Sequence, residues 1–295
     1  MGHSNQDENA SQSLHDVNLQ GVTETGLIPL QARAVDARSP NPIIGDMHAQ
    51  KVMDQLNYDF PKTSLSATNS SAVAVRTRFF DNYTRSFLAR HPASTILHLG
   101  CGLDSRALRV DWGGGAVCWV DVDLPPTLAL RKLVMPMAEL TRDYRLVGAD
   151  VAANAAWLEG IPGDRPTAVV MEGLISYMTE AERTALLLHL VEKLDEGEII
   201  MDCISPQLLG AGRHARVEAV RQTGAVFQSA IGDPKQLEAV HERLQLVETV
   251  RFAELPGIEL LPYAYRFQMD LLSWIPGLRD SVRYLRYRIL PRQVS

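Results

Sequence analysis

The sequence predicts an α/β protein built on a mostly parallel, Rossmann-like sheet, and three observations carry this prediction. Apolar runs of strand length alternate with helical segments between residues 94 and 203, which is the rhythm of βαβ units with right-handed crossovers. Gly100 and Gly102 follow the first run, and Asp123 ends the second. Glycines let the backbone approach a ligand, and an acid about twenty residues later suits a ribose diol.

The composition indicates a folded chain without a membrane or nucleic-acid partner. Of the 295 residues, 46% are hydrophobic and 22% are charged, and the net charge is −6 at pH 7. This is enough apolar material for a sizeable core, and the basic residues are too dispersed for nucleic acid to be the main partner. No apolar run has membrane-spanning length, and the polar start lacks a signal-peptide core. We therefore expect a cytoplasmic protein.

The cysteines and histidines favour free thiols and no metal site. Cys101, Cys118 and Cys203 have neither C-x-x-C nor metal-ligand spacing. Such cysteines are typical of buried thiols in a reducing compartment. The histidines also lack ligand spacing.

The first ninety residues are predicted to form a helical cap that precedes the sheet. Residues 1–16 are polar, and we expect a disordered leader there. The cap is assigned to 17–92, with a helix from Asp46 to Asn57 and a longer amphipathic helix from Ala72 to Arg90. The pair His91-Pro92 ends the longer helix.

The predicted core over 93–204 contains five strands, expected at 94–99, 116–121, 144–147, 168–171 and 198–203. Thr179 and Glu182 form a capping box, which predicts a helix from there to about Leu194. After the fifth strand the alternation stops. Residues 206–243 read as helical, so we expect an inserted helical lid over 205–245. Residues 246–295 are expected to complete the core, with closing strands at 246–252 and 284–290 in an antiparallel hairpin.

Asp104 and Ser105 bear on which nucleotide binds. Ser105 stands where a dinucleotide fold has its third glycine, and Asp104 precedes it. An acid facing a diphosphate would be repelled, whereas a cationic ligand without phosphate would be accepted. S-adenosylmethionine, with its ribose, adenine and sulfonium, is such a ligand. A nicotinamide dinucleotide and a glycine turn without any ligand are the alternatives.

Acids also end the later strands. Asp150, Glu172 and Asp202 follow the third, fourth and fifth runs. Because the carboxyl ends of parallel strands meet at one edge of the sheet, we expect an acidic rim there that suits a cationic ligand. Helix N-capping is the alternative for Asp150 and Asp202.

Several motifs together resemble the leucine carboxyl methyltransferase family, in particular its branch of tetracenomycin-type polyketide O-methyltransferases. They are RTRFFD (76–81), LGCGLDSR (99–106), VDLP (122–125), GAD (148–150) and EGLISYM (172–178). The likeness extends over roughly residues 20–290. It implies a class I methyltransferase sheet, S-adenosylmethionine as cofactor, and methyl transfer to oxygen.

The resemblance implies which residues meet the amino-acid end of the cofactor. Arg76 would bind the methionine carboxylate in a charge-assisted bond, with Arg78 as the alternative. The amino-acid portion of the cofactor would run past Gly100 and Gly102, and Glu172 would face its amine or its sulfonium.

The resemblance also implies the contacts of the nucleoside end. Asp123 and Leu124 would meet the ribose, and Asp150 with Val151 would meet the adenine. One position departs from the pattern of many methyltransferases, because His98 stands where they carry an acid two residues before the first glycine.

The acceptor site is expected between the N-terminal cap, the loop after the fourth strand and the lid. Ser176 and Tyr263 would line it, and Tyr177 would orient the acceptor oxygen or simply pack under the lid. Arg33 would pair with an acidic substrate or be solvated. A carboxylate acceptor needs no base, whereas a phenol with a pKa near ~10 does, and His214 is the candidate for that base.

The sequence therefore predicts an S-adenosylmethionine-dependent O-methyltransferase that acts on a small acidic or phenolic, polyketide-like metabolite. Carboxyl methylation is the favoured version. Methylation of a protein C-terminal carboxylate and a non-catalytic cofactor-binding protein are the alternatives. Nothing in the pattern indicates an oligomeric state.

Overall fold

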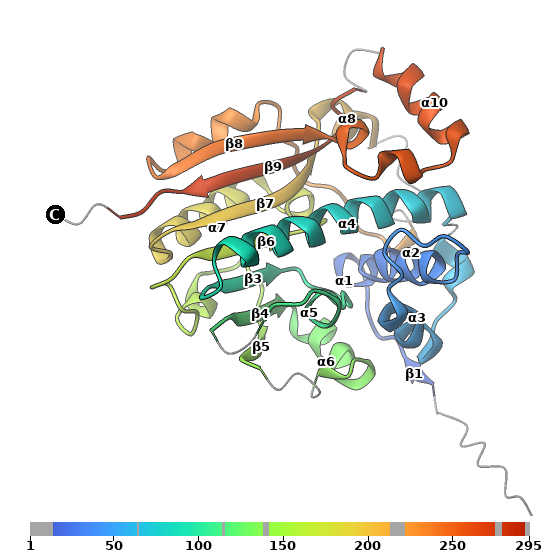
Figure 1. The fold of residues 1–295 in the computed structure, drawn as a ribbon, viewed down its shortest axis with the longest axis horizontal. Coiled ribbons are helices and arrows are strands. Elements are labelled where there is room, and N and C mark those ends of the chain that lie inside the picture. Colours follow the sequence, from blue (N-terminus) through green and yellow to red (C-terminus); the bar gives the residue numbers. More distant parts are fainter. Residues whose placement is uncertain are drawn as a thin grey trace, which may run out of the picture.

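A seven-stranded sheet with the order β5-β4-β3-β6-β7-β9-β8 forms the centre of the computed structural model (Figure 1), which describes residues 14–63, 65–113, 116–137, 142–212, 222–274 and 279–292. β9 is antiparallel to both of its neighbours, and the other pairs are parallel. The strands are β3 (Thr95–Leu99), β4 (Cys118–Asp123), β5 (Tyr144–Gly148), β6 (Thr167–Met171), β7 (Gly197–Ile204), β8 (Leu244–Arg251) and β9 (Val282–Ile289). The predicted α/β class and mostly parallel sheet are confirmed.

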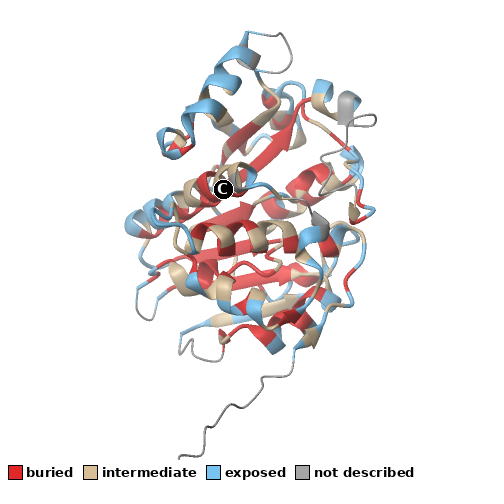
Figure 2. Ribbon diagram, turned by 90° about the vertical axis from the view of Figure 1, so that its right-hand side faces the viewer, coloured by how far each residue is buried: buried red, intermediate tan, exposed pale blue. Residues whose placement is uncertain are grey.

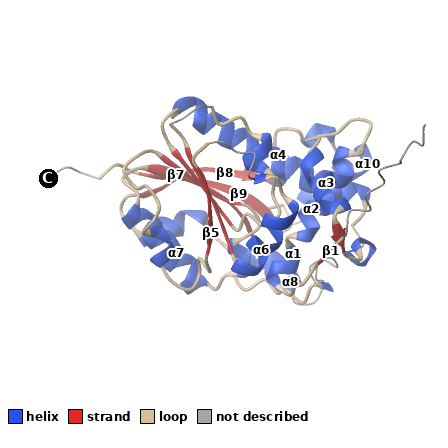
Figure 3. Cartoon of the chain, turned by 90° about the horizontal axis from the view of Figure 1, so that it is seen from below, coloured by secondary structure: helices blue, strands red, loops and turns tan. Residues whose placement is uncertain are grey.

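Helices cover both faces of the sheet, which is why its central strands are buried throughout. Every residue of β3, β6 and β7 is buried (Figure 2). Successive side chains of a strand point to opposite faces, so Ile96 joins one core cluster and Leu97 the other. Helix α4 (Ala67–Arg90) lies on the first face and α7 (Glu180–Lys193) on the second (Figure 3). The capping box of Thr179 and Glu182 begins α7 as predicted.

The N-terminal region is mainly helical but not entirely so. Its elements are α1 (Val22–Thr25), α2 (Leu27–Ala37), α3 (Met47–Asp54), a 3-10 turn η1 (Phe60–Thr63) and α4. A two-stranded parallel sheet pairs β1 (His15–Asp16) with β2 (Leu56–Asn57). The predicted leader is therefore wrong at 15–16, and the predicted helix end at 55–57 is wrong too. The rest of that leader, 1–13, lies outside the described residues.

Helix α4 begins five residues earlier than predicted. Ser66 caps it by accepting a hydrogen bond from the backbone N–H of Asn69 at 3.1 Å. This side-chain cap satisfies a backbone donor that the first turn leaves unpaired. Short helices α5 (Arg106–Arg109) and α6 (Pro125–Val134) follow β3 and β4.

The segment after β7 is only partly helical. It contains α8 (Pro206–Gly212) and the 3-10 helix η5 (Pro234–Val240), but residues 225–231 form neither helix nor strand, so the prediction of helix throughout 206–243 is wrong there. The N–H of Gln228 donates to the carbonyl of Ser176 and that of Ile231 to Ile204. These long-range bonds replace the local bonds of a helix. His214 lies outside the described residues.

The chain between β8 and β9 contains η6 (Phe252–Glu254), η7 (Ile258–Leu260) and α10 (Tyr263–Ser273). In Figure 1, α10 lies beyond the same end of the sheet as α2 and α3. Among the described helices, none is both long and apolar enough to cross a bilayer.

Candidate cofactor site

A glycine turn, residues 100–102, connects β3 to α5 at the carboxyl edge of the sheet. Gly100 has φ 65° and Gly102 has φ 51°, a region that favours glycine. A Cβ added to Gly100 would lie 3.0 Å from Leu174 Cδ1, and one added to Gly102 would lie 4.0 Å from the Cα of Gly26. The turn thus brings bare backbone to the place where the ends of β3, β4 and β6 meet.

Asp123 ends β4 and faces this turn. Its Oδ2 accepts from the Gly102 N–H at 2.7 Å, and its Oδ1 accepts from the Leu124 N–H at 2.7 Å. Burial raises the pKa of Asp123 above its usual value, although these hydrogen bonds oppose the shift. Each carboxylate oxygen accepts more than one hydrogen bond, so Asp123 retains acceptor capacity at the turn.

The end of β5 lies beside that of β4. Asp150 is exposed, and its Oδ1 accepts from the backbone N–H of Ala152 at 2.9 Å. Val151 is buried. Asp150 therefore caps a turn rather than the helix of the alternative prediction, while its carboxylate stays open to solvent.

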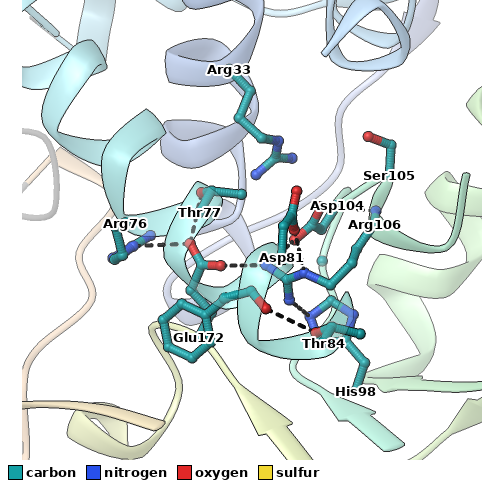
Figure 4. A network of polar contacts seen from close by, with 12 residues as sticks. Arg33, Arg76, Thr77, Asp81, Thr84, His98, Asp104, Ser105, Arg106 and Glu172 are labelled. Atoms are coloured by element: carbon teal, nitrogen blue, oxygen red, sulfur yellow. Dashed lines mark hydrogen bonds and ion pairs between the residues drawn. The ribbon is translucent and has the colours of Figure 1, made fainter. Parts of the chain in front are cut away.

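Glu172, directly after β6, is bound by three donors (Figure 4). Its Oε1 accepts from Arg76 Nε and from Thr77 Oγ1, both at 2.9 Å. Its Oε2 accepts from Arg106 Nη2 at 2.6 Å. Burial opposes the charge of Glu172, but Arg76 and Arg106 hold its pKa below the usual value. Glu172 is therefore an anion held between α4 and α5.

Arg76 bridges two strand ends. It binds Glu172, and its Nη1 lies 3.5 Å from Asp202 Oδ2 at the end of β7. Asp202 Oδ1 also accepts from the Gly173 N–H at 2.6 Å. Burial opposes the charge of Arg76, yet the two carboxylates raise its pKa. The Arg76 side chain is 22% exposed, unlike the fully buried side chain of Arg106.

Buried arginines and acids continue behind this edge, and we call Arg76, Asp81, Asp104, Arg106, Arg109 and Glu172 the arginine network. Arg106 Nε donates to Asp81 at 2.8 Å, and Arg109 Nε donates to the other oxygen of Asp81 at 2.7 Å. Asp104 accepts from the backbone of Arg106 at 3.0 Å. Burial opposes its charge, but Arg106 and Arg109 hold the pKa of Asp104 well below its usual value.

The network corrects the predicted acidic rim. Glu172 and Asp202 are each paired with Arg76, so these two strand ends do not present free negative charge. Asp104 is buried and bound by arginines rather than facing a ligand. Asp123 and Asp150 are the rim acids that lack an arginine partner among the described ion pairs. The sequence did not show the neutralisation because the arginines come from other elements.

The loop after Glu172 lies against the segment that follows β7. The carbonyl of Ser176 accepts from the Gln228 N–H at 2.8 Å, and that of Tyr177 accepts from Gln228 Nε2 at 2.6 Å. The ring of Tyr177 packs against Phe227 at 5.1 Å between centroids. Burial raises the pKa of Tyr177, while a hydrogen bond with Thr25 opposes the shift. Tyr177 thus contacts both the N-terminal region and the predicted lid.

Some residues predicted for the site lie elsewhere. Arg33 is 2% exposed, its Nε donates to Asp46 at 3.1 Å, and its Nη2 donates to the Leu103 carbonyl at 2.9 Å. The solvated alternative is therefore wrong, and the guanidinium already has a carboxylate partner. Arg78 points toward the Ile43 carbonyl, 3.4 Å away, because residues two positions apart on a helix do not share a face, and Arg78 comes two positions after Arg76. Tyr263 is 74% exposed on α10, stacked with Phe267.

Other residues of the site were missed by reading the sequence. The main ones are Asp81, Arg106 and Gln228. One signal was present for the first two: both are charged residues within the motifs RTRFFD (76–81) and LGCGLDSR (99–106), and buried charges need partners. Gln228 carries no such signal, because its role depends on where the loop of Tyr177 lies.

Comparison with known proteins decides the family. The model of the family described as leucine carboxyl methyltransferase matches residues 27–191. The tetracenomycin polyketide synthesis O-methyltransferase TcmP of Streptomyces glaucescens is 35% identical over 92% of this chain and 98% of its own length. The chain belongs to the leucine carboxyl methyltransferase family. The S-adenosyl-L-methionine-dependent methyltransferase dpfgK of Gibberella zeae is 36% identical over 75% of this chain and 79% of its own length.

Solved structures agree on the fold of this methyltransferase. A structure from Thermobifida fusca YX superposes with a TM-score of 0.55 over 88% of this chain and 94% of that one, at 16% identity. A DUF574 family protein from Streptomyces avermitilis MA-4680 gives 0.53 over 88% and 96%, at 17% identity. The class I methyltransferase sheet predicted from the sequence is confirmed.

The cofactor of the methyltransferase is S-adenosylmethionine, as predicted, and the residues at the carboxyl edge fit it. At the glycine turn, Gly100 and Gly102 present backbone without side chains, and a Cβ at Gly100 would press on Leu174. Asp123 supplies a carboxylate beside this turn, and Arg76 supplies a partly exposed side chain on the β6 side of it.

Proposed function

We propose that this methyltransferase transfers the methyl group to an oxygen of a small, polyketide-like metabolite, with a carboxylate as the favoured acceptor. The observation that carries the proposal is the similarity to TcmP, which extends over 98% of that protein. The similarity thus includes regions outside the cofactor site, where an acceptor would be bound.

The nucleoside end of the cofactor would lie over the ends of β4 and β5. Asp123 would accept hydrogen bonds from the ribose hydroxyls, with Leu124 beside it. Asp150 and Val151 would meet the adenine, because the exposed carboxylate of Asp150 has only one backbone partner. This arrangement follows the rule that ligands bind beyond the carboxyl ends of parallel strands.

The amino-acid end would pass Gly100 and Gly102 toward the β6 side. The Arg76 side chain would bind the carboxylate of the cofactor, and Glu172 would accept a hydrogen bond from its ammonium group. Arg78 is disfavoured for this role, because its guanidinium points to the α2–α3 connection.

Bound S-adenosylmethionine supplies a methyl group activated by its positive sulfur. The acceptor oxygen would attack the methyl carbon as the carbon–sulfur bond breaks, so opposite charges are lost together and a dry site favours the step. Tyr177 is protonated at neutral pH, as an ordinary tyrosine is, and burial raises its pKa further. It would therefore donate a hydrogen bond that orients the acceptor, with Ser176 beside it and Tyr263 farther out on α10. His214 is proposed as a base only for a phenolic acceptor.

The test uses purified protein, S-adenosylmethionine and matched acceptors: an aromatic polyketide acid, its methyl ester with the phenols free, and a peptide ending in leucine. Mass spectrometry reports the gain of one methylene, and mild alkali then hydrolyses esters but not ethers. We expect an alkali-labile product from the acid alone. A stable product from the ester would show a phenol acceptor, and a methylated peptide would show a protein substrate. No transfer to any acceptor, with tight cofactor binding, would overturn the proposal.

A further inference from the structure

Arg106 on α5 binds side chains from three other parts of the fold, one of which is Glu172. None of the proposed cofactor contacts involves Arg106 itself. It is the first residue of α5, and its side chain is fully buried. Its Nε binds Asp81 on α4, its Nη1 lies 3.0 Å from His98 Nε2 on β3, and its Nη2 binds Glu172 after β6. Every nitrogen of the guanidinium therefore has a partner on a different element.

His98 fixes the orientation of this guanidinium. An arginine nitrogen can only donate, so His98 Nε2 accepts, and the ring proton is assigned to Nδ1. Nδ1 lies 3.3 Å from Asp121 Oδ1, a long electrostatic contact without good hydrogen-bond geometry. Asp121 is itself bound by Tyr144 at 2.7 Å and by Arg131. His98 is thus a neutral, buried acceptor for Arg106 and does not take the place of an acid at the glycine turn.

Glu172 is the end of this series of contacts that lies at the carboxyl edge of the sheet, directly after β6. Oε1 already accepts from Arg76 and Thr77, whereas Oε2 accepts only from Arg106 among the described hydrogen bonds. A carboxylate oxygen has two lone pairs, so Oε2 keeps one acceptor position. Charge-assisted bonds of this kind are short and directional, and Arg106 therefore sets where that position points.

We propose that Arg106 is a positioning residue for recognition of the cofactor's amino-acid end, because it holds the Glu172 carboxylate with Oε2 directed at the α-ammonium group. The inference rests on the cofactor role proposed for Glu172. Asp123 and Asp150, on β4 and β5, share no described hydrogen bond or ion pair with Arg106. Loss of Arg106 should therefore affect the amino-acid end and spare the nucleoside end.

Two probes separate the ends. S-adenosylhomocysteine has both, whereas 5′-methylthioadenosine has the same adenosine and thioether without the amino-acid portion. Arg106→Lys keeps the charge but cannot reach Asp81, His98 and Glu172 together. Calorimetry should show about a 10- to 100-fold weaker Kd for S-adenosylhomocysteine, the value of one charge-assisted bond. The Kd for 5′-methylthioadenosine should change by less than about twofold.

Arg109→Lys is the matched control. Arg109 is nearly buried and also binds Asp81 and Asp104, but it makes no described contact with Glu172. Its replacement should change the Kd of both probes by the same factor. Equal losses for both probes in Arg106→Lys, or a selective loss in Arg109→Lys, would overturn the inference.

A second variant covers the case in which Arg106→Lys does not fold. His98→Leu removes the acceptor of Arg106 Nη1 and leaves every charge in place, so it should give a smaller loss confined to S-adenosylhomocysteine; equal losses for the two probes would contradict the inference. These measurements contain no acceptor. A chain that binds both probes normally but methylates nothing would overturn the proposed function alone.

Discussion

The glycine turn and the arginine network lie side by side at the carboxyl edge of the sheet, but they hold their carboxylates in opposite ways. Backbone N–H groups hold Asp123, and burial raises its pKa. Arginines hold Glu172, and despite its burial they lower its pKa. The first carboxylate is weakly compensated and open to a ligand, whereas the second is already part of the folded structure.

This difference predicts which substitutions should weaken cofactor binding and which should destabilise the fold. A carboxylate bound by backbone can be replaced without leaving a buried cation alone. Removal of one member of a buried ion network leaves other charges uncompensated, which is strongly destabilising.

Replacement of Arg106 by methionine should lower the free energy of unfolding by about 3–5 kcal/mol, because Asp81, Asp104 and Glu172 each lose a buried partner. Urea denaturation measures this. Arg38→Met is the control, since Arg38 pairs with Asp54 at the surface at 2.6 Å. It should cost less than about 1 kcal/mol. Equal costs would show that the network does not stabilise the fold.

Replacement of Asp123 by asparagine should weaken S-adenosylhomocysteine binding by about 100-fold, because the ribose hydroxyls lose a charged acceptor. The free energy of unfolding at neutral pH should not fall by more than about 1 kcal/mol, since no cation depends on Asp123 alone. Calorimetry and urea denaturation measure the two quantities. Unchanged affinity would remove Asp123 from the cofactor site.

Gly100→Ala should destabilise the protein more than Gly113→Ala. Both residues have nearly the same φ, 65° and 66°, so both substitutions carry the left-handed penalty of about 1–2 kcal/mol. Only Gly100 has a neighbour, Leu174 Cδ1, within 3.0 Å of the added Cβ, whereas nothing lies within 4 Å at Gly113. Thermal unfolding of the two variants measures the difference, and equal melting temperatures would mean that Leu174 moves without cost.

The smallest effect is one of sign, in the pH dependence of stability. The pKa of Glu172 is lowered, so its charge stabilises the fold above the unfolded pKa of about 4.3, and this contribution is lost as pH falls through the folded pKa. The pKa of Asp123 is raised, so its contribution is lost as pH rises through the folded pKa.

The free energy of unfolding of each variant is compared with that of the unmodified protein at about pH 3 and at about pH 7. From the lower to the higher pH, Glu172→Gln should lose stability relative to the unmodified protein, and Asp123→Asn should gain stability relative to it. Urea denaturation at the two pH values gives both differences. The same sign for both variants would show that the two carboxylates are not held in opposite ways.

Reading the sequence located the elements whose signal is local. The capping box of Thr179 and Glu182 predicted the start of α7. The apolar runs predicted the strands of the parallel sheet, with bounds within a few residues of those observed. Residues 225–231 were wrongly predicted as helix, because their hydrogen bonds go to Ser176 and Ile204, which are far away in the chain. The pairing of β1 with β2 was missed for the same reason.

The sheet, the glycine turn, Asp123 at its rim and the family could be predicted from the residues alone, because each depends on residue types at fixed spacing along one segment. Which charges are free depends on contacts between segments that are far apart in the chain. Arg76, Arg106 and Glu172 come from α4, α5 and the loop after β6, and their pairing neutralises part of the rim that the linear pattern shows as acidic. Electrostatic state depends on distance in space, and spacing along the chain does not encode it.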